Sequence, residues 1–148
     1  GTWTLAAGDA ITFGPDMDAD GRPDLVMQSA AALGLVVRNA AGALTLRNKT
    51  PMGTRLIGGW IIQGGDDLYP VGNVDTNAGH ELVVESDWGV GVLTFSTALS
   101  GFVSMDPRAQ GHLVGDWLYQ YDPVVSAPDL DGDGVREFMF FRSNPYAL

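Results

Sequence analysis

The chain has 148 residues, of which 45% are hydrophobic and 18% are charged, a balance typical of a globular domain. Its 8 Lys and Arg residues against 18 Asp and Glu residues give a net charge of −10 at pH 7, which disfavours nucleic acid and anionic membranes as partners. The absence of cysteine excludes disulfides, thiolate metal sites and a cysteine nucleophile.

A repeated unit runs through the chain. Trp3, Trp60 and Trp117 follow one another at intervals of 57 residues, and Gly34 and Gly91 have the same spacing. The spacing predicts one domain over 1–148 that contains three copies of one unit. We expect repeat 1 over about 1–57, repeat 2 over about 58–114, and a partial repeat 3 over about 115–148.

The first two repeats each contain four short apolar runs that are rich in β-branched and aromatic residues. The predicted strands cover 11–13, 25–28, 35–38 and 44–47 in repeat 1, and 69–72, 82–85, 90–95 and 102–105 in repeat 2. Four strands per repeat predict an all-β fold of about two and a half four-stranded antiparallel propeller blades, an incomplete β-propeller. The partial third repeat leaves open strand edges, so we expect further blades from a longer parent chain or a homo-oligomer.

Each repeat also carries a nine-residue loop directly before its second predicted strand. Oxygen-bearing side chains occupy positions 1, 3, 5 and 9, and the backbone carbonyl of position 7 is a further candidate ligand. The predicted metal ligands are Asp16, Asp18, Asp20, Arg22 and Asp24 in the first loop, Asn73, Asp75, Asn77, Gly79 and Glu81 in the middle loop, and Asp129, Asp131, Asp133, Val135 and Glu137 in the third loop.

This ligand pattern predicts calcium as the cofactor. Ca²⁺ takes six to eight oxygen ligands with tolerance in geometry, whereas Mg²⁺ demands a tighter octahedron, and zinc and copper favour softer ligands. The alternative is that the loops are solvated Asp-Gly turns without an ion. The middle loop is the one most expected to lack an ion, because two of its positions are Asn and its glycine stands one place later.

The acidic loops, together with the acid and apolar run that follow each of them (24–27, 81–84 and 137–140), resemble the calcium-binding loops of FG-GAP or VCBS-type repeats. These repeats form the blades of integrin-α-like propellers, and propeller lectins share the Gly-Trp and acidic-loop layout. The resemblance implies a β-propeller fragment, an extracellular or cell-surface location, and a binding or adhesive role. The chain departs from the family in that the FG and GAP letters are mostly missing.

We therefore expect a non-catalytic calcium-binding recognition module whose partner is a carbohydrate, as for a lectin, or a protein. The alternatives are an accessory propeller region of a secreted hydrolase and a purely structural assembly repeat. No G-x-S-x-G elbow is present, and we expect no enzyme activity in this chain and no membrane insertion. Asp87 and Trp88 are candidate ligand-binding residues in a predicted turn, since an indole beside an acid can stack on a sugar; the alternative is that Trp88 folds back over the blade edge.

Overall fold

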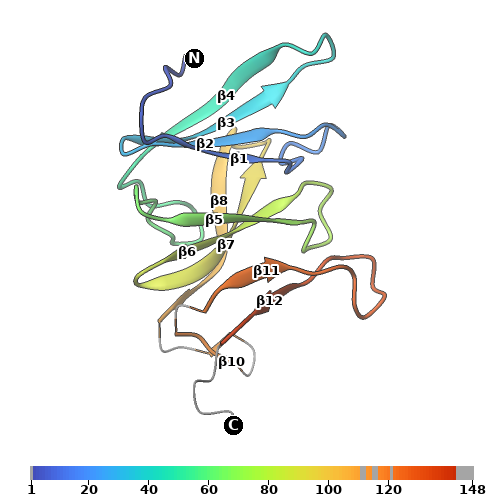
Figure 1. Cartoon of the computed structure of the whole chain (residues 1–148). Coiled ribbons are helices and arrows are strands. Elements are labelled where there is room, and N and C mark those ends of the chain that lie inside the picture. Colours follow the sequence, from blue (N-terminus) through green and yellow to red (C-terminus); the bar gives the residue numbers. More distant parts are fainter. Residues whose placement is uncertain (1, 111–112, 115–116, 121, 143–148) are drawn as a thin grey trace.

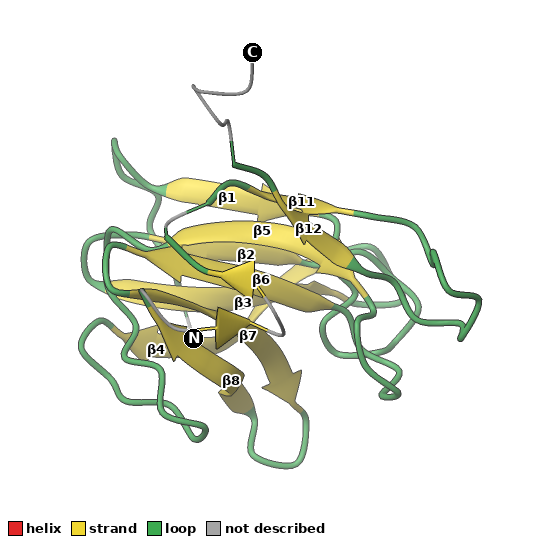
Figure 2. Cartoon of the chain, turned by 90° about the horizontal axis from the view of Figure 1, so that it is seen from below, coloured by secondary structure: helices red, strands yellow, loops and turns green. Residues whose placement is uncertain are grey.

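The computed structural model describes residues 2–110, 113–114, 117–120 and 122–142. Within these residues all regular secondary structure is β-strand, as the sequence predicts, and the strands are joined by turns and loops (Figure 2). No segment of the described chain forms a helix that is long and apolar enough to cross a membrane.

Two four-stranded antiparallel sheets make up most of the structure. The first contains β1 (Ala10–Phe13), β2 (Leu25–Gln28), β3 (Ala32–Arg38) and β4 (Leu44–Pro51) in spatial order, and the second contains β5 (Asp67–Gly72), β6 (Glu81–Ser86), β7 (Gly89–Ser96) and β8 (Gly101–Ala109). Each strand of the second sheet begins 56 or 57 residues after its counterpart in the first. The two complete predicted repeats are therefore structural repeats of four strands each.

Two small sheets lie in the C-terminal part. β9 (Leu113–Val114) pairs with β10 (Trp117–Leu118), and β11 (Val124–Ser126) pairs with β12 (Phe138–Phe140). β11 and β12 flank the third acidic loop, as the first two strands of the predicted partial repeat should, whereas the sequence did not predict β9 and β10. Parts of that predicted repeat (115–116, 121 and 143–148) lie outside the described residues.

The sheets stack on one another, with β1–β4 at the top of Figure 1, β5–β8 in the middle and β11–β12 below. Seen along the stack, β1, β5 and β11 lie along one edge and β4 and β8 along the opposite edge (Figure 2). None of the described sheets closes on itself.

Two apolar layers hold the stack together. Successive side chains of a strand point to opposite faces, so a sheet that packs on both sides needs apolar residues at consecutive positions. β6 meets this need, since all six of its residues are buried. Leu82 and Val84 pack toward the first sheet, and Val83 packs toward Tyr119 and Val124 on the third-repeat side.

The repeated tryptophans fix each sheet to its incoming loop. Trp60 is fully buried, its indole Nε1 donates to Asp66 Oδ2 at 2.9 Å, and its ring lies over Gly91. Trp3 repeats the arrangement, with a bond to Asp9 at 3.0 Å and its ring over Gly34. Trp60 therefore packs between the first and second sheets, whereas Trp3 is half-buried on the outer face of the first sheet. The side chain of Trp117 lies outside the described residues.

Candidate functional site

All three acidic loops occupy equivalent places in the fold. Each joins the first strand of a sheet to the second: β1 to β2, β5 to β6, and β11 to β12. In each loop the acid at position 9 accepts a hydrogen bond from the backbone N–H at position 2, namely Asp24 from Met17, Glu81 from Val74 and Glu137 from Leu130. This bond closes each loop and brings its ninth residue back to its start.

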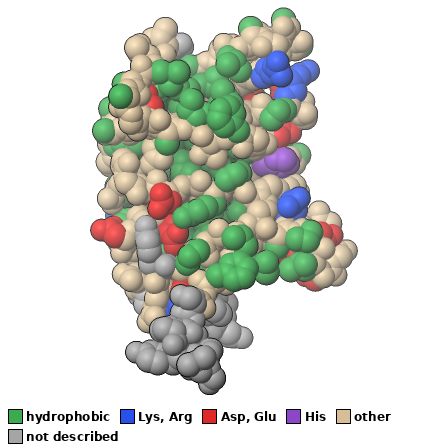
Figure 3. All heavy atoms as spheres, in the orientation of Figure 1, with side chains coloured by type: hydrophobic (Ala, Val, Ile, Leu, Met, Phe, Trp, Pro, Cys, Tyr) green, Lys and Arg blue, Asp and Glu red, His purple; other side chains and the backbone are tan. Residues whose placement is uncertain are grey.

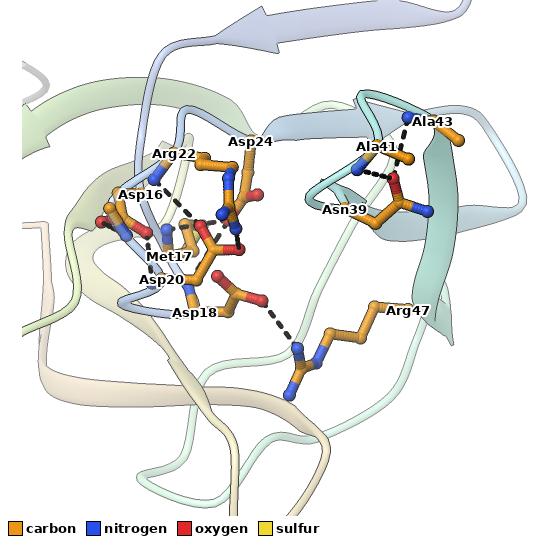
Figure 4. Close-up of polar contacts among 11 residues, drawn as sticks. Asp16, Met17, Asp18, Asp20, Arg22, Asp24, Asn39, Ala41, Ala43 and Arg47 are labelled. Carbon is orange, nitrogen blue, oxygen red and sulfur yellow. Dashed lines mark hydrogen bonds and ion pairs between the residues drawn. The ribbon is translucent and has the colours of Figure 1, made fainter.

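The first loop brings three carboxylates together. Asp16, Asp18 and Asp24 each offer an oxygen, and these oxygens lie within 4.8 Å of one another (Figure 4). Asp16 accepts backbone hydrogen bonds from Asp20 and Gly21 at 3.0 and 2.9 Å, which close the loop. Gly21 has φ +82°, a left-handed conformation that a glycine at this turn adopts without strain.

Two oxygens of this cluster are buried and lack any hydrogen-bond partner: Asp18 Oδ1 and Asp24 Oδ1. Asp24 is only 1% exposed, and its burial, followed by the nearby charge of Asp18, raises the pKa of its carboxyl from 3.8 to about 6. Buried carboxylate oxygens are normally satisfied by a donor or a cation. The chemistry of this donor set therefore fits a hard cation.

Two arginines modify the first loop. Arg47 reaches across from β4 and pairs with the other oxygen of Asp18, Oδ2, at 2.6 Å (Figure 4). Arg22 pairs with Asp20 at 2.7 Å, and Asp20 does not belong to the group of converging carboxylates. Of the four side-chain ligands predicted in this loop, the structure thus brings together three.

The third loop brings together all four of its predicted acidic side chains. Asp129, Asp131, Asp133 and Glu137 offer oxygens within 4.8 Å of one another. Its backbone also matches the first loop: positions 4 and 6 have positive φ in both, at Ala19 and Gly21 in the first loop and at Gly132 and Gly134 in the third. The first three acids and position 4 are exposed, so water reaches this cluster more freely than the first.

The middle loop differs in backbone and in donor content. None of its residues has positive φ, and the predicted ligand Gly79 does not make the left-handed turn that Gly21 makes. The Asn77 amide donates to Asp75 Oδ2 at 2.7 Å, and the Asn73 amide donates to the Asn77 carbonyl. Glu81 is fully buried, and burial raises its pKa to about 7. The side-chain amides of this loop thus bond one carboxylate oxygen, Asp75 Oδ2, and one backbone carbonyl, and only two acids remain as side-chain ligands.

The two residues of the second predicted site, Asp87 and Trp88, lie in different surroundings. Asp87 is exposed, whereas Trp88 is half-buried and packs against Trp60 with the ring centroids 4.2 Å apart. Trp88 folds back, the second of the two expected alternatives, yet it still lines a groove of about 510 Å³ with Arg55 and Gln63. Its indole Nε1 is buried without a partner.

Two residues that bond the acids of the first loop, His80 and Arg47, could not be predicted from the sequence pattern. His80, from the middle loop, accepts the Asp16 N–H on its Nδ1 at 3.0 Å and donates its own N–H to the Asp16 carbonyl at 2.8 Å. Arg47 lies 29 residues from its partner Asp18. His80 reaches Asp16 only when the two sheets stack, and Arg47 reaches Asp18 only when the strands of the first sheet pair, so no local pattern reveals either contact.

Comparisons with known proteins give no match to this chain, whether with protein-family models, with curated proteins or with solved structures. The resemblance to FG-GAP and VCBS-type repeats therefore rests on the sequence motifs alone.

Proposed function

We propose that this protein is a calcium-binding recognition module built from incomplete propeller blades of the FG-GAP or VCBS type, in a secreted or cell-surface protein. The observation that supports it best is the pair of buried, unpartnered oxygens Asp18 Oδ1 and Asp24 Oδ1, which converge with Asp16 in the first loop. The four converging acids of the third loop add a second site with the same loop conformation.

In this proposal the ions stabilise the strand connections. Asp16, Asp18 and Asp24 hold one ion, and Asp129, Asp131, Asp133 and Glu137 hold another. The carbonyls of Arg22 and Val135 complete the oxygen set, and Asp20 joins it when its carboxylate leaves Arg22. Calcium supplies the positive charge that a cluster of like charges lacks. The middle loop is proposed to be ion-free, because it has two acids where the other loops have four and lacks their left-handed turn.

Calorimetric titration of the chelated protein with Ca²⁺ tests this assignment. We expect two sites in the wild type, one in Asp18→Ala and one in Asp131→Ala, because each substitution removes a converging carboxylate. Asp75→Ala should leave both sites intact, and Asp87→Ala serves as a control for the loss of one exposed acid outside the loops. A wild type that takes up no calcium at millimolar concentration would show that the loops are turns only.

The recognised ligand is proposed to be a carbohydrate bound in the groove beside Trp88. An indole face next to a guanidinium and an amide offers stacking together with hydrogen-bond donors, and the groove contains all three in Trp88, Arg55 and Gln63. A glycan array with the wild type and with Arg55→Ala tests this. Specific binding that the substitution weakens supports a carbohydrate ligand, and an array without any binding leaves a protein partner as the alternative.

A further inference from the structure

The outer face of the first sheet is equivalent, by the 57-residue repeat, to the face of the second sheet that packs against the first. Phe13, Leu25 and Val36 stand opposite one another across β1, β2 and β3, and Arg38 stands opposite Leu44 across β3 and β4, so all five share the face turned away from Val26 and Leu35. The residues 57 positions after Leu25, Val36 and Arg38 are Leu82, Leu93 and Phe95. Those three are buried against the first sheet.

Part of this outer face is exposed and hollow, although Val36 is only 7% exposed and Trp3 lies over Gly34 on the same face. Phe13 is 66% exposed and Leu44 is 60% exposed. Together with Pro23, Leu25 and Arg38 they line a groove of about 480 Å³, which we call the head groove. Apolar side chains at this exposure on a sheet face, in register with a buried interface elsewhere in the chain, indicate an interaction surface.

A matching projection occurs at the other end of the stack. Position 2 of each acidic loop points into the next unit: Met17 is 1% exposed in the first apolar layer, and Val74 packs into the second. The third residue of this series, Leu130, is 62% exposed. Its N–H bond to Glu137 is the one that Met17 and Val74 make to their own loop acids, so the loop presents it in the same way.

The two ends of the stack also differ in charge. Residues 1–57 contain five Lys and Arg against five Asp and Glu, whereas residues 58–148 contain three against thirteen. Figure 3 shows Lys and Arg side chains gathered at the upper right, over the first sheet, and more Asp and Glu side chains lower down. The head groove is lined by one cation, Arg38, and by the buried acid Asp24. Leu130 lies between Asp129 and Asp131, so the favourable charge contact between the two ends is that of Arg38 with these acids.

We propose that the head groove binds the C-terminal unit of a second copy of this chain, with Leu130 of one copy inserted between Phe13, Leu25 and Leu44 of the other. The joint repeats the sheet-to-sheet packing that the chain already makes twice within itself. Because the two surfaces differ, the contact is head-to-tail and generates a ring or an open chain rather than an isolated two-fold dimer.

One feature distinguishes this joint from those within the chain. Inside the chain, the N–H at loop position 8 donates to the carbonyl at position 1 of the preceding loop: His80 to Asp16, and Arg136 to Asn73, both at 2.8 Å. The first loop has Pro23 at position 8, which has no N–H to donate. The joint between copies therefore lacks this hydrogen bond, and Pro23→Ala should tighten it.

Sedimentation velocity from micromolar to near-millimolar protein, with calcium present, tests the proposal. We expect concentration-dependent association that Phe13→Ser or Leu130→Ser weakens by about tenfold or more, as for the loss of a central interface anchor. Leu99→Ser is the matched control, because Leu99 is 59% exposed on the β7–β8 turn, away from both ends. Unchanged unfolding midpoints will show that the variants fold, since all three side chains are exposed.

A mixing experiment separates a head-to-tail joint from any other contact. Phe13→Ser keeps Leu130, and Leu130→Ser keeps the head groove, so the two variants together should form a one-to-one complex that does not extend further. Three results would overturn the proposal: a wild type that stays monomeric at near-millimolar concentration, association that neither substitution weakens, or a Leu130→Ser variant that associates like the wild type.

Discussion

At the scale of single residues, two equivalent glycines allow tryptophan rings to lie directly on a strand. A Cβ at Gly91 would stand 3.0 Å from Trp60 and 3.4 Å from the Pro107 backbone, and a Cβ at Gly34 would stand 2.8 Å from Trp3. The two sites differ in how freely the tryptophan ring can move to make room for an added methyl group. Trp60 is fully buried between two sheets, whereas Trp3 lies half-buried near the N-terminus on the outer face.

We therefore expect Gly91→Ala to lower the free energy of unfolding by about 1–3 kcal/mol, as for overpacking of a rigid core. Gly34→Ala should have a smaller effect, because Trp3 can swing away into solvent. Denaturant unfolding measures both differences, and a red shift of tryptophan emission should accompany Gly34→Ala only. Equal losses of stability in the two variants would contradict this account of their surroundings.

At the scale of elements, a buried acid joins the second sheet to the third-repeat side of the stack. Glu85 of β6 is 2% exposed, and its two carboxylate oxygens accept hydrogen bonds from Tyr119 at 2.5 Å and from Tyr69 of β5 at 3.2 Å. Burial raises the pKa of Glu85, the two hydrogen bonds lower it, and the charges of Asp67 and Asp122 add a further upward contribution. The net direction is upward.

The raised pKa predicts a pH dependence of stability. An acid whose pKa is raised in the folded state stabilises the fold fully below its unfolded pKa, and that contribution is lost as pH rises through the folded value. Glu85→Gln should abolish this loss. The difference in unfolding midpoint, variant minus wild type, should therefore increase as pH rises from about 4.5 toward neutral. Asp87→Asn, at an exposed acid nearby, is the control. Parallel midpoint curves for Glu85→Gln and the wild type would rule the effect out.

Removing the tyrosine that donates to Glu85 should instead lower the stability of the fold at neutral pH. Tyr119→Phe leaves Glu85 Oε1 buried without the donor that it has from Tyr119. A buried acceptor left without its partner costs about 1–3 kcal/mol, and a charged one more, so we expect a loss of stability of at least this size at neutral pH. Urea unfolding at pH 7 and at pH 4.5 measures it, and the loss should shrink at the lower pH as Glu85 becomes protonated.

At the scale of the whole molecule, the proposed ion site of the first loop lies at the contact between the first and second sheets. Asp16 exchanges two hydrogen bonds with His80 of the neighbouring loop, so an ion that orders Asp16 also orders the joint between the first and second sheets. Chelation should lower the melting temperature, and each site occupied at about a hundredfold excess over its Kd should restore about 3 kcal/mol.

Calorimetry with and without chelator measures that change, and hydrogen exchange locates it. We expect the amides of Asp16 and His80 to gain protection when calcium is added, and the amide of Asn77 in the middle loop to stay as it is. Asp18→Ala should remove the gain at both Asp16 and His80. Protection that rises equally throughout the chain would show that the ion acts on global stability and not on this joint.

The sequence by itself determined the repeat, the four-strand unit and the position of the acidic loops, because these follow from short-range patterns. Turn residues and runs of β-branched residues mark strands locally, and the strands of the first two repeats appear where they were predicted. The first and last residues of the strands were predicted less accurately. β3 begins at Ala32 rather than at 35, since pairing with β2 and β4 overrides the weak strand propensity of Ala and Gly.

Only the tertiary structure decided which candidate residues act together. It separated Asp20 from the cluster of Asp16, Asp18 and Asp24, and it turned Trp88 onto Trp60. It also buried Glu85 between two tyrosines and left Phe13 and Leu130 uncovered at opposite ends of the stack. Asp20 is held by a near neighbour, Arg22, but for the other outcomes the physical reason is range. Residues far apart in the chain meet only once the strands have paired and the sheets have stacked.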